Sequence, residues 1–284
     1  ILVNGAECEP YITSDTRTML DETDLVWKGV KQMQAHLQPR QILLCIEKNK
    51  PQCIQRFQAL CQGEAGIQVL ALPQRYPQGG EKVLLYTALG KVLPEGKLPI
   101  DVGAIVINCT TVAAFARYIE TGMPLVERCV TVDGGAVAHP QNVIAPIGTA
   151  LRDLFAFCGG FRREPKNVFY GGPMMGVSVP SLDYPVLKST NAALALDEKE
   201  GTPPDPTPCI KCGRCIRHCP IGLMPQAIER AYRLNRPEEL EKLKVSLCMR
   251  CGCCSYVCPA KRPLVQINKM ANLLVRQYRA QERR

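Results

Sequence analysis

Apolar residues follow two alternating patterns along the first 125 residues. Continuous apolar runs predict strands at 1–4, 41–46, 67–72 and 104–108. Between them, apolar residues recur every three or four positions, as on the buried face of a helix. These helical stripes are Val26, Val30, Met33 and Leu37; Ile54, Phe57 and Cys61; Leu85, Ala88 and Val92; and Val112, Phe115 and Ile119. The alternation predicts an α/β domain whose parallel sheet is covered on both faces.

The pattern changes at Val126. Residues 126–176 contain short apolar stretches separated by Gly-Gly pairs and prolines, with one short helix, and predict a small β-rich module. Residues 177–208 follow as a return segment and linker, whose last nine residues, "EGTPPDPTP", hold four prolines and predict a semi-rigid spacer. We therefore expect domains at 1–125 and 126–176, then the linker, and a last domain at 209–284.

Charge separates the same parts of the chain. Residues 1–200 carry 19 Lys and Arg against 20 Asp and Glu, whereas residues 201–284 carry 16 against 6. No apolar run of about 18 residues predicts a membrane span, and no signal peptide is visible. The chain begins inside a predicted strand and without Met, so we expect the natural protein to start further upstream.

Two stretches of the basic part share one cysteine spacing. "CIKCGRCIRHCP" (209–220) and "CMRCGCCSYVCP" (248–259) both have the form C-x2-C-x2-C-x3-C-P. Bacterial ferredoxins use this spacing for [4Fe–4S] clusters, and the Cys before proline ligates the other cluster. The predicted ligands are Cys209, Cys212, Cys215 and Cys258 for one cluster, and Cys248, Cys251, Cys254 and Cys219 for the other.

Structural zinc is the alternative for these cysteines. Zinc needs only two C-x2-C pairs, which leaves the third Cys and the Cys-Pro unexplained in both copies, so iron–sulfur is favoured. Disulfides are disfavoured because the chain is long and carries no export signal. Cys253 breaks the ladder spacing and is interpreted as a small packed thiol, not a ligand.

Helical periodicity surrounds the two cysteine ladders. The stretch between them predicts two helices, the second starting at Pro237. Residues 261–284 contain seven basic residues and one acid, with an apolar stripe at helical spacing, and predict an amphipathic basic helix. Either the stripe folds onto the cluster module, or the helix docks on acidic partner proteins or anionic lipid. The lack of interleaved aromatic residues disfavours nucleic acid.

Three turn segments follow predicted strands of the first domain. They are "NGAECEP" (4–10), "YPQGGEK" (76–82) and "INCTT" (107–111). In an open parallel sheet, loops at the carboxyl ends of the strands form the ligand crevice. No G-x-G-x-x-G opens a predicted helix, so the ordinary dinucleotide fingerprint is missing. Thr110 or Thr111 is also the predicted N-cap of the helix that follows.

Several motifs, in order along nearly the whole chain, resemble RnfC, a component of the Rnf electron-transport complex. They are "NGAECEPYIT", "YPQGGEK", "GGPMMG" followed by "LDYPVLKSTN", and "CGCCSYVCPAKRPLVQ". Residues 1–122 resemble more distantly the flavin- and NADH-binding subunit of respiratory complex I, and 126–160 resemble the β-grasp (SLBB) module of both. The resemblance implies an α/β parallel-sheet flavin/NADH-type domain, a β-grasp module and an α-helical two-cluster ferredoxin-like domain.

The resemblance implies FMN in the α/β domain, NADH as substrate and two [4Fe–4S] clusters. The complex I pattern has an acidic residue where this chain has Ala6, so the hydrogen bonds to the flavin differ. The family's Gly-rich flavin loop and an N-terminal domain are expected before residue 1, and without them we expect FMN to bind weakly or not at all. Carried over by position, the flavin contacts are Asn4, Asn108 and Thr111, and the residues near flavin or nicotinamide are Glu7 and Glu81.

The resemblance further implies the electron-transfer subunit of a translocase, an ion-translocating NADH:ferredoxin oxidoreductase. Such a subunit is held at the cytoplasmic face of the membrane by the other subunits of the complex, has no transmembrane helix, and exchanges electrons with ferredoxin through the complex. We expect no nucleic-acid partner. A cobalamin-reductase-type flavin/iron–sulfur protein, a non-catalytic iron–sulfur relay adaptor and a zinc-stapled interaction protein remain as alternatives.

Overall fold

The computed structural model of the protein describes residues 1–282 and divides into two compact units. The first covers Ile1–Thr202, and the second begins at Pro203, inside the predicted Pro-rich linker. The end of the predicted basic tail, residues 283–284, lies outside the described residues. Each unit has hydrophobic cores of its own.

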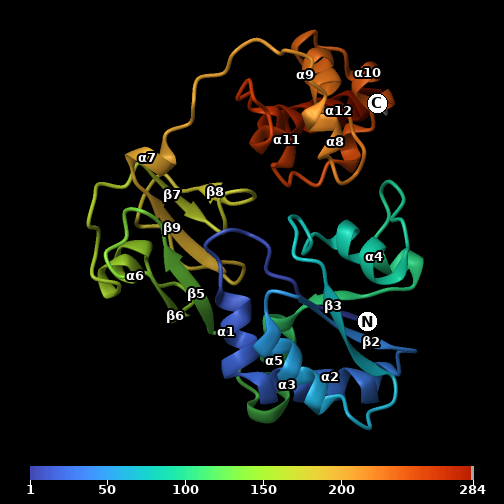
Figure 1. Ribbon diagram of the computed structural model, residues 1–284, viewed down its shortest axis with the longest axis vertical. Coiled ribbons are helices and arrows are strands. Elements are labelled where there is room, and N and C mark those ends of the chain that lie inside the picture. Colours follow the sequence, from blue (N-terminus) through green and yellow to red (C-terminus); the bar gives the residue numbers. More distant parts are fainter. Residues whose placement is uncertain (283–284) are drawn as a thin grey trace. The chain divides into compact units, whose positions relative to one another are not determined.

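The first domain is built on a four-stranded sheet with the order β3-β2-β1-β4, and all its neighbouring strands are parallel (Figure 1). These strands coincide, to within two residues at each end, with the predicted apolar runs. The predicted parallel α/β architecture is therefore confirmed. The strands are β1 (Leu2–Gly5), β2 (Ile42–Glu47), β3 (Ile67–Leu72) and β4 (Val106–Asn108).

Hydrophobic cores on both faces of this sheet explain its continuous apolar strands. Val3 and Leu44 belong to a core shared with α2 and α5, whereas Leu2 and Leu43 belong to a core shared with α4. Because successive strand residues point to opposite faces, a strand covered on both sides is apolar throughout. The helices are α1 (Ser14–Asp21), α2 (Thr23–Leu37), α3 (Pro51–Leu60), α4 (Glu81–Leu89) and α5 (Cys109–Thr121), with a short 3-10 turn, η1 (Pro99–Val102).

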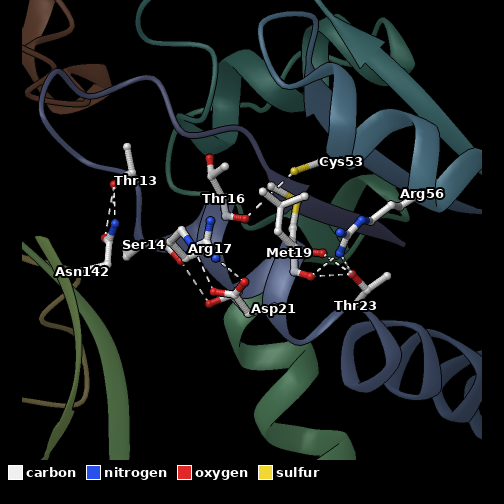
Figure 2. Close-up of polar contacts among 12 residues, drawn as sticks. Thr13, Ser14, Thr16, Arg17, Met19, Asp21, Thr23, Cys53, Arg56 and Asn142 are labelled. Atoms are coloured by element: carbon white, nitrogen blue, oxygen red, sulfur yellow. Dashed lines mark hydrogen bonds and ion pairs between the residues drawn. The ribbon is translucent and has the colours of Figure 1, made fainter.

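Helix α1 was not predicted, because its sequence "SDTRTMLD" is mostly polar and shows no apolar stripe. Tertiary contacts fix it instead (Figure 2). Thr13 donates its backbone N–H to Thr131 Oγ1 at 3.0 Å and accepts a hydrogen bond from Asn142 Nδ2 at 2.8 Å, while Arg56 of α3 donates to the carbonyl of Leu20. Helix α1 therefore ties the first sheet to the second.

The N-terminus of α5 differs from its prediction. Asn108, not Thr110 or Thr111, is the N-cap, because its Oδ1 accepts the Thr110 N–H at 2.8 Å. The prediction was wrong because the helix starts immediately after β4, and the last strand residue is therefore already the cap.

The second sheet of the first unit has the order β6-β5-β9-β7-β8. Helix α6 (Leu151–Phe157) contributes Leu151, Leu154 and Phe155 to the core of this module. A single helix on a small mixed sheet agrees with the predicted β-rich module. The strands are β5 (Glu127–Asp133), β6 (Gln141–Pro146), β7 (Asn167–Tyr170), β8 (Val177–Ser178) and β9 (Ala192–Leu196).

Strand β9 comes from the segment expected to be a return segment. It lies in the middle of the sheet, parallel to β5 and antiparallel to β7. Its sequence "AALAL" is fully buried, but alanine is depleted in strands and gives no local strand signal. Its pairing is therefore set by tertiary structure. A short helix, α7 (Glu198–Gly201), ends the unit, with Asp197 as its N-cap.

The second unit is helical. The long helix α12 packs against α9 and α10, and its residues Ala271 and Val275 belong to the core that contains Ile228. The apolar stripe of the predicted basic helix is therefore folded onto the module. Within residues 1–282, every helix is too short or too polar to cross a bilayer. The helices are α8 (Arg214–Arg217), α9 (Pro225–Arg233), α10 (Pro237–Lys242), α11 (Cys253–Tyr256) and α12 (Leu264–Glu282), with a 3-10 turn, η2 (Val245–Leu247).

Candidate metal and cofactor sites

The two cysteine ladders adopt the same backbone path. Lys211 and Gly213 in the first ladder have left-handed φ values of 56° and 72°, and Arg250 and Gly252 at the matching positions of the second have 61° and 81°. Each glycine is the N-cap of a one-turn helix, α8 or α11, that carries the third Cys of its ladder. The sequence repeat is thus a structural repeat, in which left-handed residues curl the loop around a common centre.

The eight predicted ligands line two separate cavities. Three thiols of the first ladder and the last thiol of the second ladder line the larger cavity, whereas three thiols of the second ladder and the last thiol of the first line the smaller one. This is the crossed grouping that the sequence predicts, although the binding of iron itself stays a prediction. The larger cavity has Cys209, Cys212, Cys215 and Cys258, and the smaller one has Cys219, Cys248, Cys251 and Cys254.

The spacing of these thiols fits a cluster better than a single ion. Among residues 1–282, no three His, Cys, Asp or Glu side chains converge closely enough to hold one metal ion. Thiolates around one zinc each lie about 2.3 Å from the metal and so within about 4 Å of one another. The quartets instead frame cavities, as the four corner ligands of an iron–sulfur cube do.

The two quartets differ in exposure. Cys209 and Cys212 are exposed, whereas Cys251 and Cys254 are buried. Burial raises the pKa of the Cys254 thiol to about 12. Loading iron at this quartet therefore requires the release of protons, because the thiolate is the form that binds metal.

The three predicted turn segments meet at the carboxyl end of the first sheet. Asn4 and Asn108 are register partners at the ends of β1 and β4, where the strand order reverses. Asn4 Nδ2 donates to the Gly79 carbonyl at 3.0 Å, and Asn4 Oδ1 accepts the Ala6 N–H at 3.1 Å. A Cβ on Gly79 would lie 2.5 Å from the Ala6 carbonyl oxygen, so only glycine permits this approach.

Two predicted flavin-site residues are committed to a buried hydrogen-bond network around Asp15. Glu7 Oε1 accepts the Asp15 N–H at 2.8 Å, and Glu7 Oε2 accepts the Thr16 hydroxyl at 2.6 Å, so this carboxylate caps α1. Asn108 Nδ2 donates to Asp15 Oδ2 at 2.8 Å, and Thr110 Oγ1 donates to Asp15 Oδ1 at 2.9 Å. Burial raises the pKa of both carboxyls.

The remaining predicted residues lie apart from this network. Glu81 is the first residue of α4 and Thr111 lies in the first turn of α5, and both side chains are exposed. Sequence reasoning overlooked Asp15, whose only local signal is an acidic residue in the first turn of a polar helix.

The carboxyl end of the sheet also holds polar groups that the described residues leave unsatisfied. Glu47, the last residue of β2, is 1% exposed, and its Oε2 has no hydrogen-bond partner. Gln78, just before α4, is fully buried, and its Nε2 is likewise unpartnered. Buried polar atoms are rarely left unpaired, so this edge fits a polar ligand. With Asn4 and the close Gly79 backbone, these groups fit a cofactor such as FMN.

Comparisons with protein families find the three predicted domain types. Residues 1–117 match the family described as the Nuo51 FMN-binding domain, residues 129–178 match the SLBB domain, and residues 204–259 match the 4Fe-4S dicluster domain. Together with the two sheets and the helical unit, these matches confirm the predicted fold class. They also agree with the predicted cofactors, FMN and two [4Fe–4S] clusters.

Curated relatives carry the name that the sequence motifs suggest, since each is the C component of its complex. The chain is 41% identical over 227 residues to that component of the proton-translocating ferredoxin:NAD(+) oxidoreductase complex of Clostridium ljungdahlii, covering 80% of this chain and 50% of that protein. It is 41% identical over 245 residues to that component of the ion-translocating oxidoreductase complex of Yersinia pseudotuberculosis, covering 86% and 35%. The chain thus spans half or less of the length of these relatives, and the predicted resemblance is confirmed.

A solved structure shares the fold. The NAD+-reducing [NiFe]-hydrogenase in its H2-reduced state aligns with a TM-score of 0.62 at 15% identity, covering 97% of this chain and 55% of that chain. At this identity the likeness concerns the fold alone. It spans nearly the whole chain, including both units.

Proposed function

We propose that this chain, which resembles the RnfC component of ion-translocating oxidoreductases along most of its length, is the electron-transfer subunit of an NADH:ferredoxin oxidoreductase. In this proposal, electrons pass between NADH at an FMN site on the first sheet and two [4Fe–4S] clusters in the second unit. The observation that carries the proposal is the crossed arrangement of eight cysteines around two cavities, attached to an FMN-type domain.

The chain's residues supply position and electrostatics for this chemistry. When bound, FMN accepts two electrons as hydride from NADH and releases them singly, which matches the one-electron capacity of each cluster. Asn4 holds the "QGG" turn against β1, and Gly79 lets the backbone approach a ligand closely. Asn108 and Glu7 act through Asp15 and α1, which fix the loops that surround the site.

Membership of a membrane complex is part of the same proposal. We expect the other subunits of the complex to hold this chain peripherally at the cytoplasmic face, with ferredoxin reached through the complex. The excess of basic residues in 201–284 supports contact with acidic partner proteins or anionic lipid. No feature of the described residues calls for nucleic acid as a partner.

The test is composition and reduction of the anaerobically prepared, full-length protein that contains this chain. Two [4Fe–4S] clusters require about eight iron and about eight sulfide per chain. The brown absorption near about 400 nm should bleach when NADH is added. Zinc in place of iron refutes the proposal.

A second candidate function is a relay adaptor without a flavin. It is favoured by one observation, namely that Asn4, Glu7 and Asn108 already satisfy their hydrogen bonds within the protein. Flavin content decides between the two. Full iron with about one FMN per chain and bleaching by NADH supports the enzyme, whereas full iron without flavin and without an NADH response supports the adaptor.

A further inference from the structure

The smaller cysteine cavity contains a buried amide that the fold itself does not need. Asn268 of α12 is 2% exposed and lies between Leu264 and Ala271, which pack the helix against the rest of the unit. Its Nδ2 donates toward Cys248 Sγ at 3.7 Å, and its Oδ1 has no partner among the described residues. An unsatisfied buried carbonyl destabilises a protein, so an apolar side chain would serve packing better.

Other hydrogen bonds reach thiols of the same quartet. The Leu223 N–H donates to Cys219 Sγ at 3.3 Å. Cys253, which lines the cavity together with Asn268, forms a hydrogen bond with Cys251. Three of the four predicted ligands in this cavity thus have a hydrogen-bonding neighbour, and two of these neighbours are side chains that mutation can remove.

We propose that Asn268, together with Cys253, raises the reduction potential of the [4Fe–4S] cluster held by the quartet in the smaller cavity. The inference deepens the proposed function and rests on it, because it requires a cluster at this site. Reduction adds one electron, and therefore one negative charge, to the cluster and its thiolates. A hydrogen-bond donor directed at a ligating sulfur stabilises this more negative state, and such hydrogen bonds set the potentials of iron–sulfur clusters.

The larger cavity provides an internal reference for this effect. There the side-chain contact to a predicted ligand is between Cys215 Sγ and Gln226 Oε1 at 3.5 Å, from helix α9 and not from α12. A change at Asn268 therefore acts on one quartet and leaves the contacts of the other unchanged. Asn268 is a positioning residue, because it acts through Cys248.

The test is a redox titration of the full-length protein followed by electron paramagnetic resonance. Asn268→Leu keeps the size of the side chain and removes the donor. We expect the potential of the cluster at Cys248 to become more negative, while that of the other cluster stays unchanged. A Cys212→Ser variant assigns the signals, because it perturbs the larger cavity. Cys253→Ala should shift the same cluster in the same direction by a smaller amount.

The matched control is Asn272→Leu. Asn272 is buried one turn further along α12, and its Nδ2 donates to the Val245 carbonyl at 3.4 Å rather than to sulfur. This variant should leave both potentials unchanged, which separates a sulfur contact from a general effect of removing a buried amide.

The outcomes are distinct. Unchanged potentials in Asn268→Leu with full iron overturn the inference, as does an equal shift in Asn272→Leu. If Asn268→Leu fails to hold iron, Cys253→Ala decides the matter. Loss of one cluster in Cys253→Ala marks this Cys as a ligand and overturns the donor role. Wild-type protein without iron refutes the proposed function instead, so the two failures differ.

Discussion

Glu7 and Asp15 place two carboxyl groups in one buried corner of the first domain. Asp15 receives hydrogen bonds from Asn108 and Thr110, and Glu7 receives them from the start of α1. Even so, burial dominates and raises the pKa of both groups, and the negative charge of Asp15 raises that of Glu7 further. At neutral pH, the folded protein therefore holds charge where water cannot stabilise it.

Asp15→Asn tests this cost of charge. Because the pKa is higher in the folded than in the unfolded state, the folded state binds more protons, and stability falls as pH rises from the ordinary carboxyl range through the raised pKa. Each pKa unit corresponds to about 1.4 kcal/mol. The amide can still accept from Asn108 and donate to Thr110, so we expect a flatter dependence of the free energy of unfolding on pH.

The measurement is urea unfolding between pH 5 and 8, followed by the fluorescence of Trp27, the single tryptophan of the chain. Asp24→Asn, at an exposed position of α2, is the control and should leave the profile as in the wild type. A wild-type slope in Asp15→Asn would mean that this carboxyl carries no penalty.

At the scale of elements, close packing of helices outweighs local propensity. Gly29 lies inside α2, where glycine is unfavourable by about 1 kcal/mol relative to alanine. A Cβ there would lie 2.4 Å from the backbone oxygen of Val112 in α5. The glycine therefore sets the distance between the two helices on one face of the sheet.

Gly29→Ala should lower the free energy of unfolding by about 1–3 kcal/mol, because overpacking outweighs the gain in helix propensity. Chemical unfolding followed by circular dichroism measures this change. Ala35→Gly, at an exposed position of the same helix, should cost about 1 kcal/mol from propensity alone. Stabilisation by Gly29→Ala would contradict the packing seen between α2 and α5.

Local sequence predicted the elements that have a strong pattern and missed those that do not. The four parallel strands were predictable because each is apolar on both faces. Helix α1 and strand β9 were not, since one is polar and held by Glu7 and Thr13, and the other is an alanine-rich run held by its neighbours β5 and β7. In both, the deciding contacts come from residues distant in sequence.

At the scale of the whole molecule, the second unit is organised by the crossing of its two ladders. Cys219 leaves the first ladder to line the cavity of the second, and Cys258 does the reverse. The two cavities therefore depend on each other through the chain segments that connect them, α9 and α10 on one side and α12 on the other.

Cys258→Ser should damage the cluster framed by Cys209, Cys212 and Cys215 and spare the other. Cys219→Ser should do the opposite. Iron analysis and electron paramagnetic resonance measure this, with about four iron retained in the spared cluster. Cys61→Ala, a half-buried thiol of the first unit, should keep all the iron. Damage confined to the quartet in which Cys258 stands in sequence would contradict the crossed arrangement.

The sequence by itself determined the α/β class, the two cysteine ladders, their crossed pairing and the charge division, because these depend on short-range spacing that the chain carries along its length. Only the tertiary structure decided that Asn108 and Glu7 serve a buried network around Asp15, and that Asn268 of α12 points at Cys248. The physical reason is that a hydrogen bond or a burial cost depends on which distant groups fold against a side chain. Local pattern carries no record of that.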